Sequence, residues 1–430
     1  MAKAPFTALT KEQIEKAYDC AKAQYKALGI DTDKAIATLQ ATPISLHCWQ
    51  GDDVKGFEVH EGEVSGGGIM AIGNYPGPAM NAEMLRKDAE KALSLIPGTK
   101  RFNLHAIYAE TDGKVVDRDA ITPKHFTKWM KWSKDNKVAL DFNPTFFAHP
   151  KANSGYTLSN ADPEIRKFWI AHDKACRRIA EAFGKNQGCP CVVNHWMPDG
   201  AKDQPIDRLT PRKLMAESLD AIFAEKVNPK YCKDAVESKL FGLGSEDYVV
   251  GSHEFFMGYA MTRKDIMVCL DMGHFHPTEN IYDKISSILN FKKELLLHVS
   301  RGIRWDSDHV VILNDDLRCL FQQVVRGNFL KSVNIALDFF DASINRIGAW
   351  VIGTRATQKA ILAALLEPSK LMADYEAAND GAVKLALLEE LKTYPLGADW
   401  NMFCLSQGVP AGTAWLNDRI DYDRKVIKKR

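Results

Sequence analysis

The segment between residues 294 and 340 decides the fold, because it places a helical stretch between two short apolar runs. It reads ELLLHVS (294–300), LRCLFQQVVRGNFL (317–330) and VNIALDFF (333–340). The outer runs have the apolar content of strands that are buried on both faces, and the middle stretch has the period of an amphipathic helix. This order predicts two neighbouring parallel strands that are joined by a helical crossover.

The same unit recurs along the chain. Eight apolar runs are bounded by polar or turn residues, and they begin at Ile44, Phe102, Val138, Cys191, Asp234, Ile266, Glu294 and Val333. Helical stretches lie between them, for instance at 82–96 and 124–136. Eight such units close a (β/α)₈ barrel, an α/β TIM barrel, which is the fold we expect. An open, doubly wound sheet is the alternative, but the glycine-rich stretch 62–77 neither follows a clear strand nor opens a helix, as a dinucleotide or phosphate loop does.

The chain of 430 residues is longer than eight units require. We expect residues 1–366 to form the barrel with an amino-terminal helix, and residues 367–430 to form a carboxyl-terminal helical extension. The extension would serve as an oligomer contact. Its alternative role is a helical cap that packs on its own barrel.

The charges nearly cancel, with 56 lysines and arginines against 55 aspartates and glutamates. This balance argues against a polybasic protein that binds nucleic acid or a membrane. Nine cysteines are scattered along the chain without a CxxC pair, and we interpret Cys189 and Cys191 as structural. The sequence contains no run of about 18 apolar residues that could span a membrane. We therefore expect a soluble cytoplasmic protein that has no nucleic-acid or membrane partner.

Polar side chains gather where the predicted strands end, the edge at which barrel enzymes place their active sites. These residues are His105, Glu237, Lys239, Asp271, His274, His298 and Asp338, with Asp306 and Asp308 just beyond the seventh run. Taken singly, a strand-end histidine or acid is usually structural. Five acids at one rim would repel one another strongly unless cations neutralised them, so the sequence predicts divalent metal, and two ions rather than one.

Local spacing supports a metal site. Asp306 and Asp308 stand two apart, which places both carboxylates on one side of an extended segment. Gly273 lets the chain turn between Asp271 and His274. Oxygen and imidazole ligands without cysteine favour Mn²⁺, Co²⁺, Zn²⁺ or Mg²⁺. For 305–309 alone, a solvated acidic turn remains the alternative.

Two further kinds of side chain are candidates for substrate contact. Lys239 could polarise a substrate oxygen or simply pair with a carboxylate. Four aromatic residues near the ends of runs could pack on a sugar ring, although core packing is the alternative for each; they are Trp49, Phe142, Trp196 and Phe340.

Together, the segments HCWQGDD, GNYPG, FNLHAIYAE, DAVESKLFG, LDMGHFHPTE, LLLHVS, RWDSDHVV and LDFFDASINRIGAW resemble the L-rhamnose isomerase family, in order and over nearly the whole chain. The resemblance implies a barrel of the xylose-isomerase kind, usually a homotetramer, that converts L-rhamnose to L-rhamnulose with Mn²⁺ or a similar ion in the first step of rhamnose catabolism. It implies His274, Asp306 and Asp308 as ligands of the catalytic metal. The other metal would take Glu237, Asp271, His298 and Asp338, while His105 and Lys239 would contact the substrate. Gly302 stands where the family is expected to have proline, which puts the affinity for metal in doubt.

The ligand-rich site favours a metal-assisted hydride shift from C2 to C1 over proton transfer through an enediol. In this hypothesis a metal-bound water near Asp338 takes the O2 proton, while Lys239 and His105 position the sugar. Another divalent-metal barrel, such as a phosphoesterase or an abasic-site endonuclease, is the alternative enzyme, although the latter needs a basic track that the charge balance does not offer. A sugar-binding module without catalysis is the non-enzyme alternative.

Overall fold

A computed structural model describes residues 5–48, 57–58, 75–242, 244–304 and 308–430. Eight parallel strands form a closed barrel in the order β1, β10, β9, β8, β6, β4, β3, β2. Their bounds are β1 Ile44–His47, β2 Lys100–His105, β3 Ala139–Asn143, β4 Cys191–Trp196, β6 Cys232–Glu237, β8 Ile266–Asp271, β9 Leu295–Val299 and β10 Val333–Leu337. Each of the eight predicted runs overlaps one of these strands, although β2 and β6 each begin two residues earlier than predicted, so the barrel is confirmed.

The segment 294–340 shows how each unit is built. Strands β9 and β10 pair in parallel, with Leu295 opposite Val333 and Val299 opposite Leu337. Between them, α9 (Asp315–Arg326) begins after Asn314, whose side chain accepts a hydrogen bond from the Leu317 backbone at 3.1 Å. The helix buries an apolar stripe against the barrel, formed by Leu317, Leu320, Phe321 and Val324.

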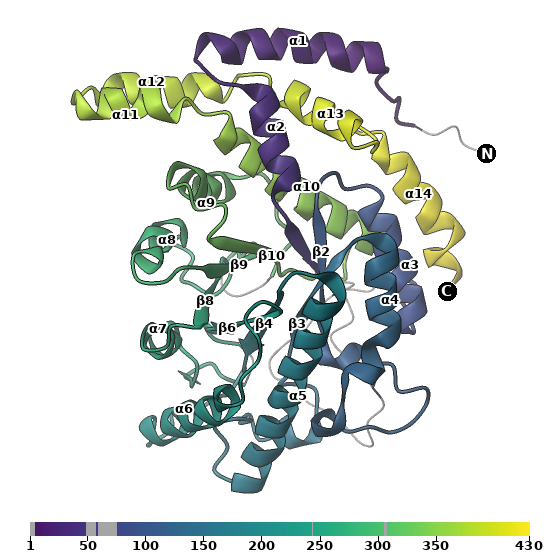
Figure 1. Ribbon diagram of the computed structural model, residues 1–430, viewed down its shortest axis with the longest axis vertical. Coiled ribbons are helices and arrows are strands. Elements are labelled where there is room, and N and C mark those ends of the chain that lie inside the picture. Colours follow the sequence, from purple (N-terminus) through teal and green to yellow (C-terminus); the bar gives the residue numbers. More distant parts are fainter. Residues whose placement is uncertain (1–4, 49–56, 59–74, 243, 305–307) are drawn as a thin grey trace.

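The other crossover helices surround the barrel in the same way (Figure 1). They are α3 Ala82–Leu93, α4 Thr127–Asn136, α5 Pro163–Gln187, α6 Leu209–Ala224, α7 His253–Met261, α8 Tyr282–Leu289 and α10 Arg346–Leu365. Short 3-10 turns occur at Ala106–Tyr108, Arg118–Ala120, Pro123–Phe126, Pro150–Ala152 and Ile427–Lys429. Throughout the described ranges, every helix is too short or too polar to span a lipid bilayer.

Additional helices flank the barrel at both ends of the chain. They are α1 Lys11–Ala27, α2 Thr32–Ala41, α11 Ser369–Ala377, α12 Gly381–Leu391, α13 Leu396–Ser406 and α14 Trp415–Lys425. Helix α1 packs along α13, and α11 and α12 form a hairpin at the edge of the molecule (Figure 1). These helices confirm the predicted terminal elements, whereas the domain boundary at 366 and the oligomer role remain predictions.

A small second sheet was not predicted. Strands β5 (Gly200–Ala201) and β7 (Tyr248–Val249) pair antiparallel beside the barrel. A Cβ atom at Gly200 would lie 2.3 Å from the Tyr248 carbonyl oxygen, so the close approach of these backbones requires glycine.

Candidate metal centre

The carboxyl ends of four neighbouring strands bring four buried or partly buried ligand-type side chains together. Glu237, Asp271, His298 and Asp338 each offer one atom, and these atoms lie within 4.8 Å of one another. His298 is central, since its Nδ1 lies 3.1 Å from Glu237 Oε1 and 3.1 Å from Asp338 Oδ2. Register explains part of the convergence, because Asp271 on β8 lies directly opposite His298 on β9.

A second group adjoins the first. Asp271, His274 and Asp308 also offer ligand atoms within 4.8 Å of one another, so Asp271 belongs to both groups. His274 Nδ1 lies 3.2 Å from Glu237 Oε1 of the first group. Asp308 adopts a φ of +40°, a left-handed conformation that aspartate tolerates better than most residues. The structure thus places two candidate ion sites side by side.

Neighbouring donors orient these carboxylates. The Asn194 side-chain amide donates to Glu237 Oε2. Ser300 Oγ and the Gly273 backbone N–H both donate to Asp271 Oδ1, each at 2.6 Å. Gly273 was predicted only as a turn residue, and Asn194 and Ser300 were not predicted for the site. The alternation of side chains along a strand could have identified Asn194 and Ser300. Asn194 stands two residues before Trp196, and Ser300 stands two residues after His298, so each points to the same face of its strand as that site residue.

Gly273 also leaves room between the two groups. A Cβ atom at this position would lie 3.1 Å from Ser300 Oγ and 3.4 Å from Asp308 Oδ1. Any larger residue would therefore crowd the carboxylates that face each other here.

The charged groups perturb one another. Burial raises the pKa of Glu237, but His298 and His274 lower it more, so the carboxylate is held well below its usual range. Burial lowers the pKa of His298, yet the surrounding anionic groups raise it well above its usual value. The pKa of Asp338 is also lowered, because the nearby imidazole of His298 outweighs burial. The carboxylates are therefore ionised at neutral pH, the state that binds metal.

The donor set fits a divalent cation. Within the described part of the chain, Asp271 Oδ2 is buried and has no hydrogen-bond partner, while Oδ1 of the same residue has two. A buried carboxylate oxygen without a donor is costly, and a cation removes that cost. Cys269 lies beside Glu237 and His298, and burial raises the pKa of its thiol, which disfavours the thiolate form that binds metal. Oxygen and imidazole groups make up the rest of the donor set.

Comparison with known proteins identifies the family. The family model described as L-rhamnose isomerase (RhaA) matches residues 12–430. The chain belongs to the L-rhamnose isomerase family. The resemblance recognised in its motifs is thereby confirmed, and the chain is an enzyme of the isomerase class.

Curated members of the L-rhamnose isomerase family match almost end to end. The L-rhamnose isomerase of Listeria innocua is 56% identical over 418 residues, which cover 97% of this chain and 99% of that protein. Those of Rhodopirellula baltica and Citrobacter koseri are 55% and 54% identical, again over 97% of this chain and over 97% and 99% of their own lengths. Among solved structures, an L-ribulose 3-epimerase gives a TM-score of 0.45 at 11% identity, covering 70% of this chain and 96% of that one, which is too distant to bear on the site.

Four more residues that the sequence predicted for this L-rhamnose isomerase family site lie near the two groups. Lys239 Nζ lies 5.6 Å from the Trp196 ring centroid, and the Trp196 ring stacks at 6.4 Å on that of His274. The Phe340 backbone N–H donates to the Asp308 carbonyl at 3.0 Å. His105 Nδ1 lies 3.3 Å from Thr145 Oγ1, and burial lowers the pKa of His105 to about 3, so its imidazole is neutral.

Phe142 does not join the site. On β3 the flanking Asp141 and Asn143 line a cavity inside the barrel, so Phe142 faces outward, where it packs on Phe126 at 5.2 Å and Phe183 at 5.4 Å. Nearness to the strand end was a poor guide, because alternate residues point to opposite faces. Two other residues predicted for the site, Trp49 and Asp306, lie outside the described residues, as does most of the glycine-rich stretch from Gly62.

Proposed function

We propose that this chain interconverts L-rhamnose and L-rhamnulose, using two divalent cations held at the carboxyl end of the barrel. The observation that carries the proposal is the pair of adjoining ligand groups that share Asp271. The family match supports the substrate, because the curated relatives are named L-rhamnose isomerase. We expect the reaction to serve L-rhamnose catabolism.

Each cation has its own set of ligands in this proposal. Glu237, Asp271, His298 and Asp338 would hold one ion, and His274 and Asp308, with Asp306, would hold the other. We propose Mn²⁺ as the working ion, with Co²⁺ or Zn²⁺ as substitutes. When bound, the cations supply positive charge that polarises the two substrate oxygens involved in the isomerisation.

The chain's own residues would bind the sugar and handle its protons. The Asp338 side chain is 24% exposed whereas Glu237 is 2% exposed, so of these two proposed ligands Asp338 is the one open to substrate. We assign to Asp338 the acceptance, through water, of the proton that leaves O2. Lys239 and the neutral imidazole of His105 would position the open-chain sugar by hydrogen bonds. Trp196 and Phe340 would pack against its carbon face, and Trp49 remains a prediction.

The hydrogen on C2 would then move directly to C1 as a hydride, so that C2 becomes the carbonyl carbon, and the proton taken from O2 would return to O1. A labelled substrate tests this step. L-Rhamnose deuterated at C2 should give L-rhamnulose that keeps the deuterium at C1, as measured by NMR. If the label appears in solvent water instead, proton transfer through an enediol replaces the hydride shift.

Metal replacement tests the activity itself. Chelated protein should lose L-rhamnulose formation and recover it when Mn²⁺ is restored, with Co²⁺ and Zn²⁺ compared in parallel. Asp308→Asn should impair recovery, whereas Asp341→Asn, an acid three residues beyond Asp338 and outside both ligand groups, should recover like the wild type. Full activity in the chelated protein, or equal recovery by both variants, would contradict the proposal.

We also propose a homotetramer that is formed partly through the 367–430 extension. Helix α12 buries none of its residues within the single chain, and Leu385 on it is 59% exposed. Light scattering should give the mass of four chains. Leu385→Glu should lower that mass, and Lys370→Glu, a change on the solvent-exposed neighbouring helix, serves as the control.

A further inference from the structure

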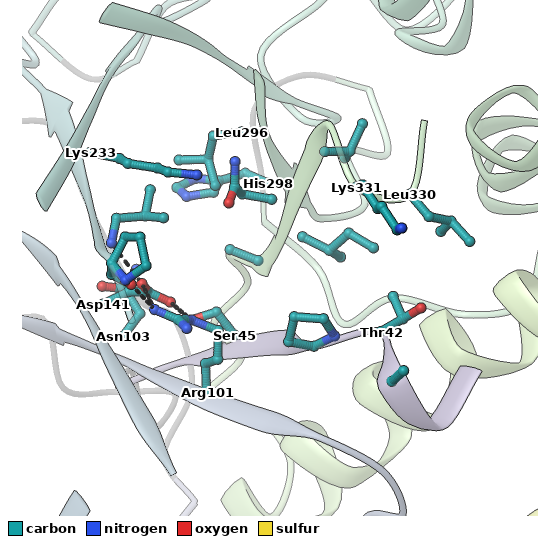
Figure 2. A pocket seen from close by; sticks show the side chains of 18 of the residues that line it. Thr42, Ser45, Arg101, Asn103, Asp141, Lys233, Leu296, His298, Leu330 and Lys331 are labelled. Carbon is teal, nitrogen blue, oxygen red and sulfur yellow. Dashed lines mark hydrogen bonds and ion pairs between the residues drawn. The ribbon is translucent and has the colours of Figure 1, made fainter. Parts of the chain in front are cut away.

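A cavity lies in the amino-terminal half of the barrel, beneath the ligand groups. Its volume is about 640 Å³, within the range of small-molecule sites. Its exposed lining residues come from α2 and the loop before β10, including Lys34 and Lys331, and its inner end reaches His298. Figure 2 shows this cavity, with Arg101, Asp141 and Ser45 joined on one side and Leu296 and His298 on another.

The barrel is hollow here because its inward-facing residues are small and polar. Barrel interiors are usually filled by layers of branched apolar side chains. In this chain β1 to β4 instead contribute Ser45, Asn103, Asn143 and Asn194 to the lining. An apolar patch faces this polar side, because Leu296 on β9 and Ala336 on β10 belong to a small hydrophobic cluster inside the barrel. The cavity therefore has a polar side on β1 to β4 and an apolar patch on β9 and β10.

Several buried polar atoms of the lining have no partner. The Oδ1 atoms of Asn103, Asn143 and Asn194, and Nε2 of His298, form no hydrogen bond with any residue that the structure describes. The four side chains belong to residues only 4%, 4%, 1% and 1% exposed, respectively. Leaving such groups unpaired costs about 1–3 kcal/mol each. An occupant of the cavity that carries hydroxyl groups would supply the missing partners.

The charged residues of the inner lining are already paired within the protein, whereas Lys34 and Lys331 lie at the exposed end of the cavity. Arg101 donates to both carboxylate oxygens of Asp141, at 2.8 Å and 2.7 Å, and Lys233 donates to Glu294 at 2.5 Å. The inner lining therefore has little net charge to attract an ion. Free amide oxygens accept hydrogen bonds, and the dianion of phosphate matches them poorly, because it has one proton to donate and otherwise only acceptor oxygens.

We propose that this cavity is a second small-molecule site, which takes a neutral polyhydroxylated ligand of the polyol or free-sugar class. Hydroxyl groups both donate and accept, so they match the three asparagines and His298, while the carbon face of such a ligand packs on Leu296 and Ala336. The site lies at the opposite end of the barrel interior from the proposed substrate position. It does not depend on the isomerase activity.

Calorimetric titration of the chelated protein with xylitol tests the site directly. We expect one xylitol per chain with a dissociation constant on the order of 1 mM, and no binding of inorganic phosphate. Ala336→Leu places three more carbon atoms in the cavity and should weaken xylitol binding at least about tenfold. Ala336→Ser preserves the volume and is the matched control, with binding within about twofold of the wild type.

Two further variants keep the test decisive if Ala336→Leu folds poorly. Asn103→Leu removes an unpaired amide at similar size and should also weaken xylitol binding. Asp308→Asn alters the other end of the barrel and should leave it unchanged. The proposal is overturned if xylitol does not bind, if phosphate competes with it, or if binding is lost in Asp308→Asn but kept in Ala336→Leu. The xylitol titration uses chelated protein and measures no turnover. Failure of the isomerase assay would therefore not change the result of the titration.

Discussion

Strand β6 carries two clusters of buried charge, one on each of its faces. On the outer face, Asp234 joins His195, Asp173 and Arg177. On the inner face, Glu237 joins the ligand groups. Both clusters are buried and both contain acids, but they differ in how their charge is balanced.

The outer cluster balances its own charge. His195 lies between two acids, with Nδ1 2.9 Å from Asp173 and Nε2 2.9 Å from Asp234. Arg177 donates to both oxygens of Asp234, at 3.0 Å and 2.9 Å. Burial lowers the pKa of His195, but Asp173 and Asp234 raise it to about 9, so two positive groups face two negative groups.

The inner cluster does not balance its charge in this way. Glu237, Asp271, Asp308 and Asp338 bring four carboxylates to two histidines. The comparison teaches that burial of charge is a weak sign of function, whereas an excess of one sign among buried ligand-type groups is a strong one. Four experiments test this difference between the two clusters.

The largest effect is expected for Asp338→Asn in the inner cluster. Loss of a ligand and proton acceptor should lower kcat at least about 10³-fold. The chelated variant should be no less stable than the chelated wild type, because one of several repelling carboxylates is gone. Kinetics with L-rhamnose and thermal melts would measure both. A stability loss as large as the loss in catalysis would make the inner cluster as structural as the outer one.

Asp234→Asn should have the opposite profile. It leaves Arg177 and His195 buried without their shared partner, at a cost of about 4 kcal/mol in the free energy of unfolding. Asp220→Asn is the control, because Asp220 pairs with Arg263 while 54% exposed, and we expect it to cost at most about 1 kcal/mol. Denaturant unfolding compares the two. Similar costs would mean that burial does not set the strength of the outer cluster.

The outer cluster should also make stability depend on pH. The pKa of His195 is about 9 in the folded chain and about 6.5 when unfolded, so the unfolded state loses its proton first. Stability from this group is complete below pH 6.5 and falls by about 3 kcal/mol as the pH rises to 9. The free energy of unfolding, measured across this pH range, should decline in the wild type. His195→Gln should lack the part of the decline that comes from His195.

The smallest effect is expected from metal removal. Ions present at a hundred times their dissociation constant stabilise the folded state by about 2.7 kcal/mol, so chelation should lower the melting temperature. Asp338→Asn should show a smaller change, and Asp234→Asn should retain the wild-type difference. An unchanged melting temperature in the wild type would argue that the inner cluster does not bind ions tightly.

The strands could be predicted from the sequence because each is a short apolar run between polar residues, as Ile266–Asp271 illustrates. Glu237, Asp271 and Asp338 could be identified because they follow such runs. The face of Phe142 was predicted wrongly, although its neighbours Asp141 and Asn143 carried the signal. Strands of two residues, such as Gly200–Ala201, are too short to produce a pattern.

The sharing of Asp271 could not be predicted, because it depends on contacts across the barrel. Its register with His298 joins β8 to β9, and its place beside His274 and Asp308 depends on loop geometry after two strands. The spacing of residues in the sequence describes each strand separately, so it gives neither the register between strands nor the geometry of the loops. The cavity inside the barrel could not be predicted for the same reason, because it depends on the inward-facing residues of β1 to β4 together.

The position of Asp271 in both ligand groups limits how far the two groups can change independently of each other. Because this one carboxylate belongs to both candidate groups, any substitution there would alter both groups in a single step. Engineering a different ion preference in one group alone would therefore work through Glu237 or Asp338 on one side, or through His274 or Asp308 on the other. Natural substitutions would face the same restriction, so the two candidate groups would change together at this position.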